Sequence, residues 1–405
     1  MSVFYSRRLM IQYGKRRANV FFQYIPAPRR KQEVLPMMKR TVTILLFALI
    51  ALTALAIVPD VRARQDTPET VFPGGINPLT GETADDPELL RKVPALVPIS
   101  RYPDEARPSA GLSFAAWIFE FYDMGGISRL FALFYGRLPS ASTGVDPYIG
   151  SLGGALYGVE DLRNHYGALL ISAGNRRAVV DDGLYNVQSW YGESGKDLYP
   201  KLPVSTYESF LTSWTAKIQP PDPELLRLPF SYGPPGTGLP AASLLVRYAP
   251  ANQTLWTYDR AAGLYTHSQN SVGNPEILPT TDALTERQLS FQNVVLLFHD
   301  TERMSDGFKP VLNFIDRRPA IVFRDGLRYD VYWTTRSGTA ENATDRFRPI
   351  RFVFENGEPF PLKPGQTWVH LVRMGNELRE VESASDLSAR AGSGNWFLPY
   401  IEAKR

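Results

Sequence analysis

The sequence predicts an α+β fold in two parts, a mixed domain of layered sheets and helices followed by a β-rich domain. Three observations predict it: a Gly125-Gly126 turn between two aromatic and branched runs, helix-like periodic segments after them, and a series of short apolar runs separated by turn residues. The chain has 405 residues, 44% of them hydrophobic, which is enough for roughly two or three packed domains. It contains no cysteine, so disulfides, thiolate nucleophiles and cysteine metal sites are excluded.

The first domain is expected at residues 77–218. Ala115–Tyr122 and Ile127–Tyr135 are rich in aromatic and branched side chains, and Gly125-Gly126 between them tolerates the positive φ angles of a tight turn. These runs are therefore predicted to form a buried β-hairpin. The remaining expected elements are a helix at Gly154–Tyr166, a strand at Ala168–Ser172 and a helix at Thr206–Ala216.

A Pro-rich linker at residues 219–240 leads to the second domain, expected at 241–375. Turn dipeptides such as Asp325-Gly326 and Asn356-Gly357 lie between consecutive apolar runs, a pattern typical of hairpin-connected strands. The predicted strands are Ser243–Tyr248, Leu255–Tyr258, Gly263–His267, Asn293–Phe298, Ala320–Phe323, Arg328–Thr334, Ile350–Phe354 and Thr367–Val372. Residues 376–405 follow as a tail.

The N-terminal residues carry an export pattern. Lys39 and Arg40 precede an uncharged apolar run, Thr41–Val58, and Val61-Arg62-Ala63 after it suits signal peptidase. We expect a signal peptide or membrane anchor at 37–63. It is preceded by an upstream extension at 1–36 and followed by a polar tether at 64–76.

A cleaved signal, an uncleaved anchor and a buried core helix are the three readings of Thr41–Val58. The run lies at the border between a signal and the ~20 residues that span a bilayer, and a cleaved signal is favoured. In both export readings the protein is extracytoplasmic, either secreted or membrane-anchored.

Charge is distributed unevenly along the chain. Residues 1–40 carry ten Lys and Arg against one acid, whereas residues 64–405 carry 33 Lys and Arg against 39 Asp and Glu. The body after the apolar run is therefore acidic, although the whole chain has a net charge of +3. We expect no nucleic-acid partner.

Ordered motifs in both halves carry a family resemblance. Those of the first half are Asn77-Pro-Leu-Thr-Gly-Glu82, Ala106-Arg-Pro-Ser-Ala-Gly-Leu-Ser113, Glu120, Gly125-Gly-Ile-Ser-Arg129 and Phe131-Ala-Leu-Phe134. Those of the second half are Tyr258-Asp-Arg-Ala-Ala-Gly-Leu-Tyr265, Gln292-Asn-Val-Val295, Ala320-Ile-Val-Phe-Arg-Asp-Gly326, Trp333 and Pro361-Leu-Lys-Pro-Gly-Gln-Thr-Trp368. Over about residues 77–375 the chain resembles the YerB-like lipoprotein family, as a divergent member without the lipidation cysteine. The resemblance implies a bacterial envelope protein with an α+β first domain, a β-rich second domain and no assigned activity.

The chain departs from that family at several polar positions. Gly153 and Leu156 stand where the family has arginines, and Ala116 and Met124 stand where it has acids. Asp181-Asp-Gly-Leu-Tyr185 lacks the family's histidine. If those polar groups form a family site, this chain has lost most of it.

Glu120 is the carboxylate that the sequence singles out. It lies in an apolar stretch, where a charge must be paired, exposed or protonated because desolvation is costly. The hairpin brings Arg129 within reach, so a structural ion pair is favoured over an acid/base or ligand-binding role. A glycosidase-like pair with Asp123 is a weaker alternative. Arg107 and Arg129 match family positions, and the resemblance points to them for an anionic ligand.

Other candidate motifs are better explained by structure. Gly233-Pro-Pro-Gly-Thr-Gly238 is followed by Leu239-Pro240 rather than by the Lys and helix of a phosphate loop, so a linker is favoured over a nucleotide site. The four histidines are far apart in sequence, and His299 near Asp300 and Glu302 is typical of a solvated turn, so no metal site is expected.

The tryptophans also have two readings. Trp117, Trp333 and Trp368 lie in apolar strand patterns and are expected in the core. Trp190 with Tyr191 has more polar neighbours and remains a candidate glycan-stacking pair.

The function that these patterns favour is an exported cell-envelope protein that binds or scaffolds without catalysis. Its expected partner is a cell-wall polymer or an envelope protein, and no cofactor is expected. The alternative is an envelope enzyme that acts on cell-wall glycan and uses Glu120 with Arg107 or Arg129. A third reading is a degenerate family member that retains only protein partners.

Overall fold

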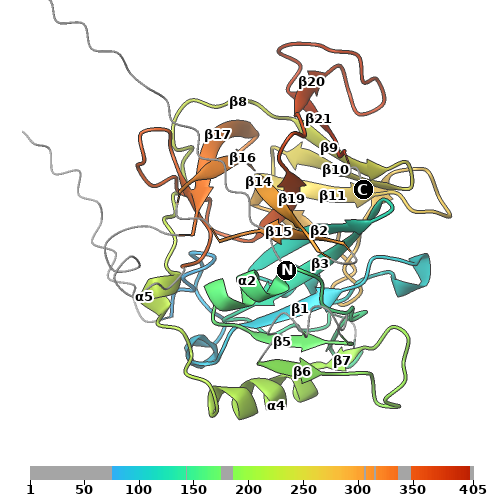
Figure 1. The fold of residues 1–405 in the computed structure, drawn as a ribbon, viewed down its shortest axis with the longest axis vertical. Coiled ribbons are helices and arrows are strands. Elements are labelled where there is room, and N and C mark those ends of the chain that lie inside the picture. Colours follow the sequence, from blue (N-terminus) through green and yellow to red (C-terminus); the bar gives the residue numbers. More distant parts are fainter. Residues whose placement is uncertain are drawn as a thin grey trace, which may run out of the picture. The chain divides into compact units, whose positions relative to one another are not determined.

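The computed structural model describes residues 75–142, 144–174, 186–304, 307–313, 316–335 and 348–401, and the strands in these ranges form two large sheets and a small one (Figure 1). The larger sheet has 12 strands in the order β18-β17-β16-β14-β19-β2-β3-β1-β5-β6, with β15 paired to β14 and β8 paired to β17. Its strands are β1 (Ala95–Ile99), β2 (Trp117–Met124), β3 (Ile127–Phe134), β5 (Leu169–Ser172), β6 (Val187–Ser189), β8 (Leu239–Pro240), β14 (Asn293–Arg303), β15 (Phe308–Val311), β16 (Arg318–Arg324), β17 (Leu327–Thr334), β18 (Arg351–Val353) and β19 (Thr367–Arg373).

The second sheet has seven strands in the order β12-β11-β10-β9-β21-β20, with β13 paired to β11, and β4 pairs with β7 separately. These strands are β4 (Tyr148–Ile149), β7 (Leu202–Pro203), β9 (Ser243–Ala249), β10 (Asn252–Asp259), β11 (Leu264–Gln269), β12 (Leu278–Pro279), β13 (Ser290–Phe291), β20 (Arg379–Val381) and β21 (Asn395–Pro399). The helices are η1 (Pro87–Arg91), η2 (Asp104–Ala106), η3 (Leu112–Phe114), α2 (Val159–His165), α4 (Val204–Thr215) and α5 (Pro223–Leu226).

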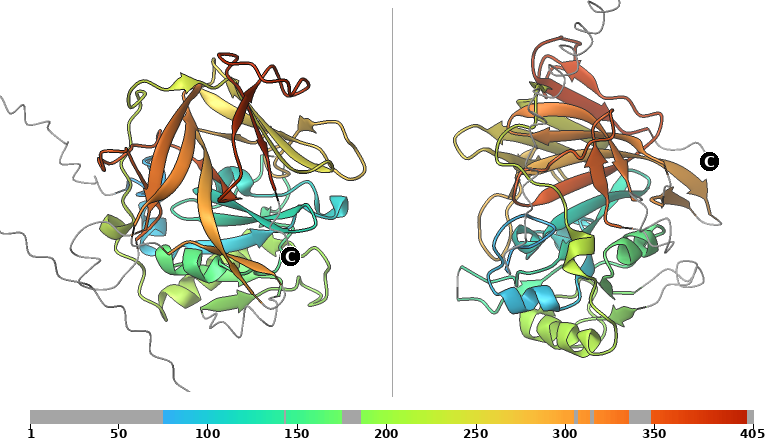
Figure 2. Two further views of the ribbon diagram at one scale, coloured as in Figure 1. Left: turned by 45° about the horizontal axis from the view of Figure 1, so that its top comes forward. Right: turned by 90° about the vertical axis from the view of Figure 1, so that its left-hand side faces the viewer.

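The larger sheet joins the two halves of the chain. Strand β19 lies between β14 and β2, and it is parallel to both. The register places Thr367 beside Trp117 and His370 beside Glu120. In Figures 1 and 2 the yellow-to-red strands of the second half lie above the cyan strands β2 and β3, and the green helix α4 lies below them. The two halves therefore share one hydrogen-bonded sheet.

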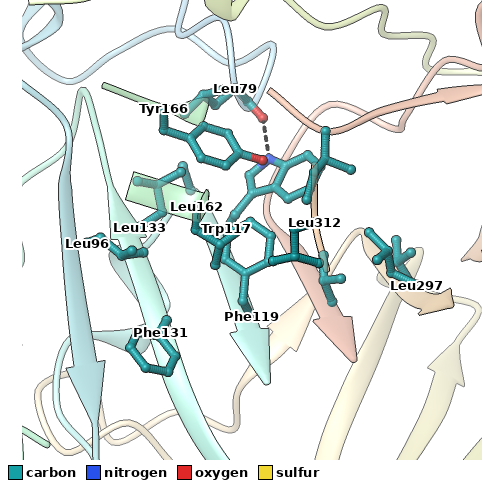
Figure 3. Close-up of a cluster of buried hydrophobic side chains, with 14 of the residues drawn as sticks. Leu79, Leu96, Trp117, Phe119, Phe131, Leu133, Leu162, Tyr166, Leu297 and Leu312 are labelled. Carbon is teal, nitrogen blue, oxygen red and sulfur yellow. Dashed lines mark hydrogen bonds between the residues drawn. The ribbon is translucent and has the colours of Figure 1, made fainter. Parts of the chain in front are cut away.

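The two faces of this sheet bury two different cores. Successive side chains of a strand point to opposite faces, so Trp117, Phe119 and Phe121 of β2 join one core and Ile118 joins the other. The first core includes Leu162 of α2 and is shown in Figure 3, where the Trp117 indole donates a hydrogen bond of 2.9 Å to the carbonyl of Leu79. The second core lies between the two large sheets.

Most of the predicted elements are present. The hairpin β2–β3, helix α2, strand β5, helix α4 and all eight predicted strands of the second half are found, with ends shifted by a few residues. The α+β expectation fits only roughly, because strands dominate and the helices are few and short in the described ranges. The three tryptophans expected in the core, Trp117, Trp333 and Trp368, are fully buried.

Two buried strands lie outside the predicted set. Strand β1 pairs with β3 and β5 in the larger sheet. Strand β21, within the expected tail, pairs with β9 and β20, so this part of the tail is built into the second sheet. The expected signal or anchor at 37–63 lies outside the described residues. Among the residues that are described, no helix is long and apolar enough to cross a membrane.

Candidate functional site

Glu120 lies on the face of β2 that is turned toward the second sheet. Its register partners are Leu130 of β3 and His370 of β19, so these side chains share that face. The Glu120 side chain is completely buried. A carboxylate in such a place must be compensated by its neighbours.

Four side chains provide that compensation. Arg101 and Ser128 donate hydrogen bonds to Oε1 of Glu120, the latter at 2.7 Å, and Trp368 donates to Oε2 at 3.1 Å. Nδ1 of His370 lies 3.1 Å from the same Oε2. Burial raises the pKa of the Glu120 carboxyl, but the Arg101 guanidinium and the His370 and Ser128 bonds outweigh burial and hold that pKa well below its usual range. Glu120 is therefore ionised, and both of its oxygens are occupied.

The two ring nitrogens of His370 have different partners. The Trp256 indole, which can only donate, lies 2.8 Å from Nε2 of His370, so Nε2 must carry a lone pair. The proton of the neutral ring is then on Nδ1, which faces Glu120 and lies 3.0 Å from the hydroxyl of Tyr248. The network is built from β2, β3, β9, β10 and β19, and it fastens the first half of the chain to the second.

Arg101 connects this network to the surface. Its side chain is 4% exposed and contacts Glu120, Gln269 and the Thr254 hydroxyl, the last at 3.4 Å. Arg107 lies beside it: Nε of Arg107 donates to the Arg101 carbonyl at 2.6 Å, and Nη1 donates to the Asn270 carbonyl at 3.1 Å. Burial and the Arg101 charge lower the pKa of Arg107 to about 10, so it remains a cation at neutral pH.

Two cavities meet at Arg107. One has a volume of about 300 Å³, and its polar lining includes Arg107, Gln269, Asn270, Asn274, Thr280 and Thr281. The other has a volume of about 150 Å³, and its lining includes Arg101, Tyr102, Arg107, Ser128 and Asn252. We call the two together the Arg107 cleft. No described residue accepts a hydrogen bond from Nη2 of Arg107.

The expected pairing of Glu120 with Arg129 is wrong. Met124 pairs with Ile127 but Tyr122 pairs with Ser128, so Asp123 is an extra residue in β2, a β-bulge. A shift of one residue moves a strand's side chains to the opposite face. Arg129 therefore pairs in register with Phe121, on the face away from Glu120, and its Nε lies 3.0 Å from Asp123 Oδ2. The structure brings Arg107 and Glu120 together through Arg101, and it leaves Arg129 apart.

Trp190 and Tyr191 follow β6, which Figure 1 shows well separated from β11, and neither residue lines the Arg107 cleft. The Trp190 indole donates to the Lys201 carbonyl at 2.9 Å, and its ring meets Phe210 of α4 edge-on. Tyr191 is 46% exposed. Trp190 is thus held by packing, and Tyr191 presents the more accessible ring.

The remaining candidates have structural surroundings. Gly233–Gly238 is followed by strand β8, and the buried guanidinium of Arg324 donates to the carbonyls of Ser231 and Gly233, both at 2.8 Å. The solvated turn expected at His299, Asp300 and Glu302 is wrong: these residues lie in strand β14, His299 is buried, and its Nδ1 lies 2.8 Å from the carbonyl of Asp300. Across the described ranges no group of three or more His, Asp and Glu side chains could hold a metal ion. Asp181–Tyr185 lies outside those ranges.

Arg101 is the site residue that the sequence analysis missed. It lies in the loop between β1 and η2, and its partners come from β2, β3, β10 and β11. No local pattern marks such a contact. The one available signal is the position of Arg101 two residues after the apolar run Ala95–Ile99.

Comparison with known proteins gives two matches in order along the chain. The N-terminal domain of a protein of unknown function, DUF3048, matches residues 79–188, and the DUF3048 C-terminal domain matches residues 244–369, together more than half of the chain. The crystal structure of the YerB protein from Bacillus subtilis is similar, with a TM-score of 0.56 and 20% sequence identity, covering 73% of this chain and 95% of that one. This likeness shows a shared fold. No curated protein matches the chain.

Proposed function

Because this chain belongs to the DUF3048 family, whose members have no assigned function, we propose its function from its own geometry: it is a binding protein of the bacterial cell envelope that holds a cell-wall glycan in the Arg107 cleft. The observation that carries the proposal is that two cavities share one cation, Arg107, in their linings. Amide and hydroxyl side chains of the lining, such as Asn274 and Thr281, can hydrogen-bond to sugar hydroxyls. Arg107 can pair with a carboxylate or phosphate of the polymer through Nη2.

The buried network favours binding over glycan hydrolysis. A glycosidase needs two carboxyl groups that reach the scissile bond from opposite sides. Glu120 has no exposed surface, and both of its oxygens are already hydrogen-bonded. The enzyme alternative, with Glu120 beside Arg107 or Arg129, therefore lacks an accessible acid, and we propose a non-catalytic role.

Export is the second part of the proposal. It rests on Lys39-Arg40, the apolar run Thr41–Val58 and Val61-Arg62-Ala63, a pattern typical of exported proteins. We propose that the chain beyond the run is extracytoplasmic, either secreted or anchored. An acidic body outside the membrane would meet an anionic cell wall only through a local cation, which Arg107 provides.

Co-sedimentation of the full-length chain with isolated peptidoglycan tests the proposed binding. We expect saturable binding that persists at high salt, because hydrogen bonds in a cleft are screened less than surface charges. Arg107→Gln should weaken it about tenfold, the cost of losing a charged hydrogen bond. Arg260→Gln, a matched change at an exposed arginine in the turn after β10, should leave it unchanged.

Arg107 also donates hydrogen bonds to two backbone carbonyls, so Arg107→Gln could lose binding by misfolding. A second variant separates these two causes. Tyr102→Leu changes an exposed side chain of the smaller cavity and should weaken binding while the thermal midpoint stays constant. Binding no greater than that of an unrelated acidic protein, or equal binding by all four proteins, would contradict a glycan site in this cleft.

A further inference from the structure

A cavity of about 200 Å³ lies apart from the Arg107 cleft, where the first family motif meets the loop before β19. Its lining includes Asn77, Glu82, Asp85, Tyr135, Arg137 and Gln366, and we call it the Glu82 cavity. The volume is far above the ~10–15 Å³ that a water needs, and it is below the ~300 Å³ of pockets that enclose drug-sized ligands. It therefore has room for one small group rather than for a whole large molecule.

The walls of the Glu82 cavity are held by backbone contacts. Nδ2 of Asn77 donates to the Tyr135 carbonyl at 2.6 Å, and the Gly365 amide donates to the Thr80 carbonyl at 2.7 Å. Gly136 has a φ of +70°, and a Cβ there would lie 2.9 Å from Nδ2 of Asn77. The cavity is thus a fixed part of the junction between the two halves.

The charges of the cavity do not cancel. Nε of Arg137 lies 3.0 Å from Oδ2 of Asp85, so these two groups neutralise each other. Glu82 makes no side-chain hydrogen bond or ion pair with any described residue. Burial raises the pKa of its carboxyl, and the nearby Arg137 charge opposes that rise. The lining therefore has two carboxyl groups, Glu82 and Asp85, against one guanidinium, and Glu82 is the carboxyl group without a direct partner among the described residues.

The amide side chains of the cavity use their donors on the backbone and leave an acceptor unused. The amide donors of Asn77 and Gln366 are turned to the backbone carbonyls of Tyr135 and Ala115, the latter at 2.6 Å. Within the described part of the chain, Oε1 of Gln366 accepts no hydrogen bond. The cavity thus offers two acceptors to a donor from outside, the Glu82 carboxyl group and the Gln366 oxygen.

We propose that the Glu82 cavity binds a primary alkylammonium group, which supplies the positive charge and the three donors that Glu82 and Gln366 lack. A single short chain ending in an ammonium fits the volume. Such a group occurs on free diamines and on lysine-like side chains of peptides. The site is independent of the Arg107 cleft, and it gives the protein a second ligand of the opposite charge.

Calorimetric titration of the full-length chain tests this site with two probes, pentane-1,5-diamine and N-α-acetyl-lysine amide. Both carry a primary ammonium, and the tighter of the two distinguishes a free amine from a peptide source. N-ε-acetyl-lysine amide has no such cation and should not bind. Glu82→Gln, which removes the charge and keeps the shape, should weaken binding about tenfold.

Two further variants make the result decisive. Glu88→Gln is the matched control, since Glu88 is an exposed acid of η1 that does not line the cavity, and it should bind like the wild type. Thr83→Phe enlarges an exposed side chain at the cavity and should block both probes without lowering the thermal midpoint. The proposal is overturned if neither probe binds, if the neutral probe binds equally well, or if Glu82→Gln leaves affinity unchanged.

Discussion

On one face of β2, Trp117, Phe119 and Phe121 pack among apolar side chains, whereas on the other face Glu120 lies among an arginine, a histidine and an indole. Both faces are buried, and adjacent residues of one strand supply them. The stability contributed by the apolar face depends on how completely its side chains fill space, so the cost of a truncation grows with the volume removed. The polar face depends on complete pairing, because a buried charge that loses its partner is far worse than no charge at all.

Removal of the Arg101 charge should have the largest effect. Arg101→Met leaves the Glu120 carboxylate buried without its cation, and the free energy of unfolding is expected to fall by about 3–5 kcal/mol. Urea unfolding measures this. Arg129→Met is the control on the other face, where the pair with Asp123 is partly exposed, and it should cost no more than about 1 kcal/mol. Similar losses in the two variants would show that the Glu120 network is not a stabilising unit.

A cavity on the apolar face should cost somewhat less. Leu133 is fully buried beside the rings shown in Figure 3, and Leu133→Ala should lower the unfolding free energy by about 3 kcal/mol. The loss arises from volume and should not change with pH. If urea unfolding showed that the stability loss of Leu133→Ala depends strongly on pH, the proposed distinction between the two faces would be wrong.

The smallest expected effect is a difference between the wild type and Arg101→Met in how the free energy of unfolding depends on pH. The folded-state pKa of Glu120 is below its unfolded value of about 4.3, so its stabilisation is complete above that value and is lost as the pH falls toward the folded pKa. In Arg101→Met burial is no longer opposed by Arg101, the folded pKa rises, and this loss is reduced or reversed. The two profiles should differ by up to about 1.4 kcal/mol per pH unit below pH 5.

Urea unfolding at several pH values between 5 and 3 measures this difference, with Leu133→Ala as the reference for all other acids. Leu133→Ala should follow the wild-type profile with a constant offset. Parallel profiles for Arg101→Met and Leu133→Ala would mean that Arg101 does not set the ionisation of Glu120.

Local patterns predicted the strands well and the site only in part. Short apolar runs and turn dipeptides mark the second-half strands because both signals lie within a few residues. Strand β1 is outside the predicted set, and its apolar run contains Pro98, a residue that is rare inside strands. Pro98 is tolerated there since β5 pairs only with Ala95 and Leu96, so the ladder on that side has ended before Pro98.

The environment of Glu120 shows where sequence reasoning stops. The need for a charged partner follows from burial alone, and Glu120 has one. The identity of the partner depends on the single extra residue at Asp123, which turns Arg129 to the other face. It also depends on Arg101, in the loop after β1, and on His370, in β19, and no local pattern around Glu120 indicates either residue.

The place of β19 beside β2 also governs the order in which the molecule can be completed. Strand β2 is made roughly 240 residues before β19, and at synthesis rates of ~5–20 residues per second that interval is roughly 10–50 s. Throughout it, β2 has an unpaired edge and Glu120 lacks His370 and Trp368. The nascent first half is therefore an aggregation hazard, and it has to be kept apart from other chains until the last major strand of the sheet is delivered.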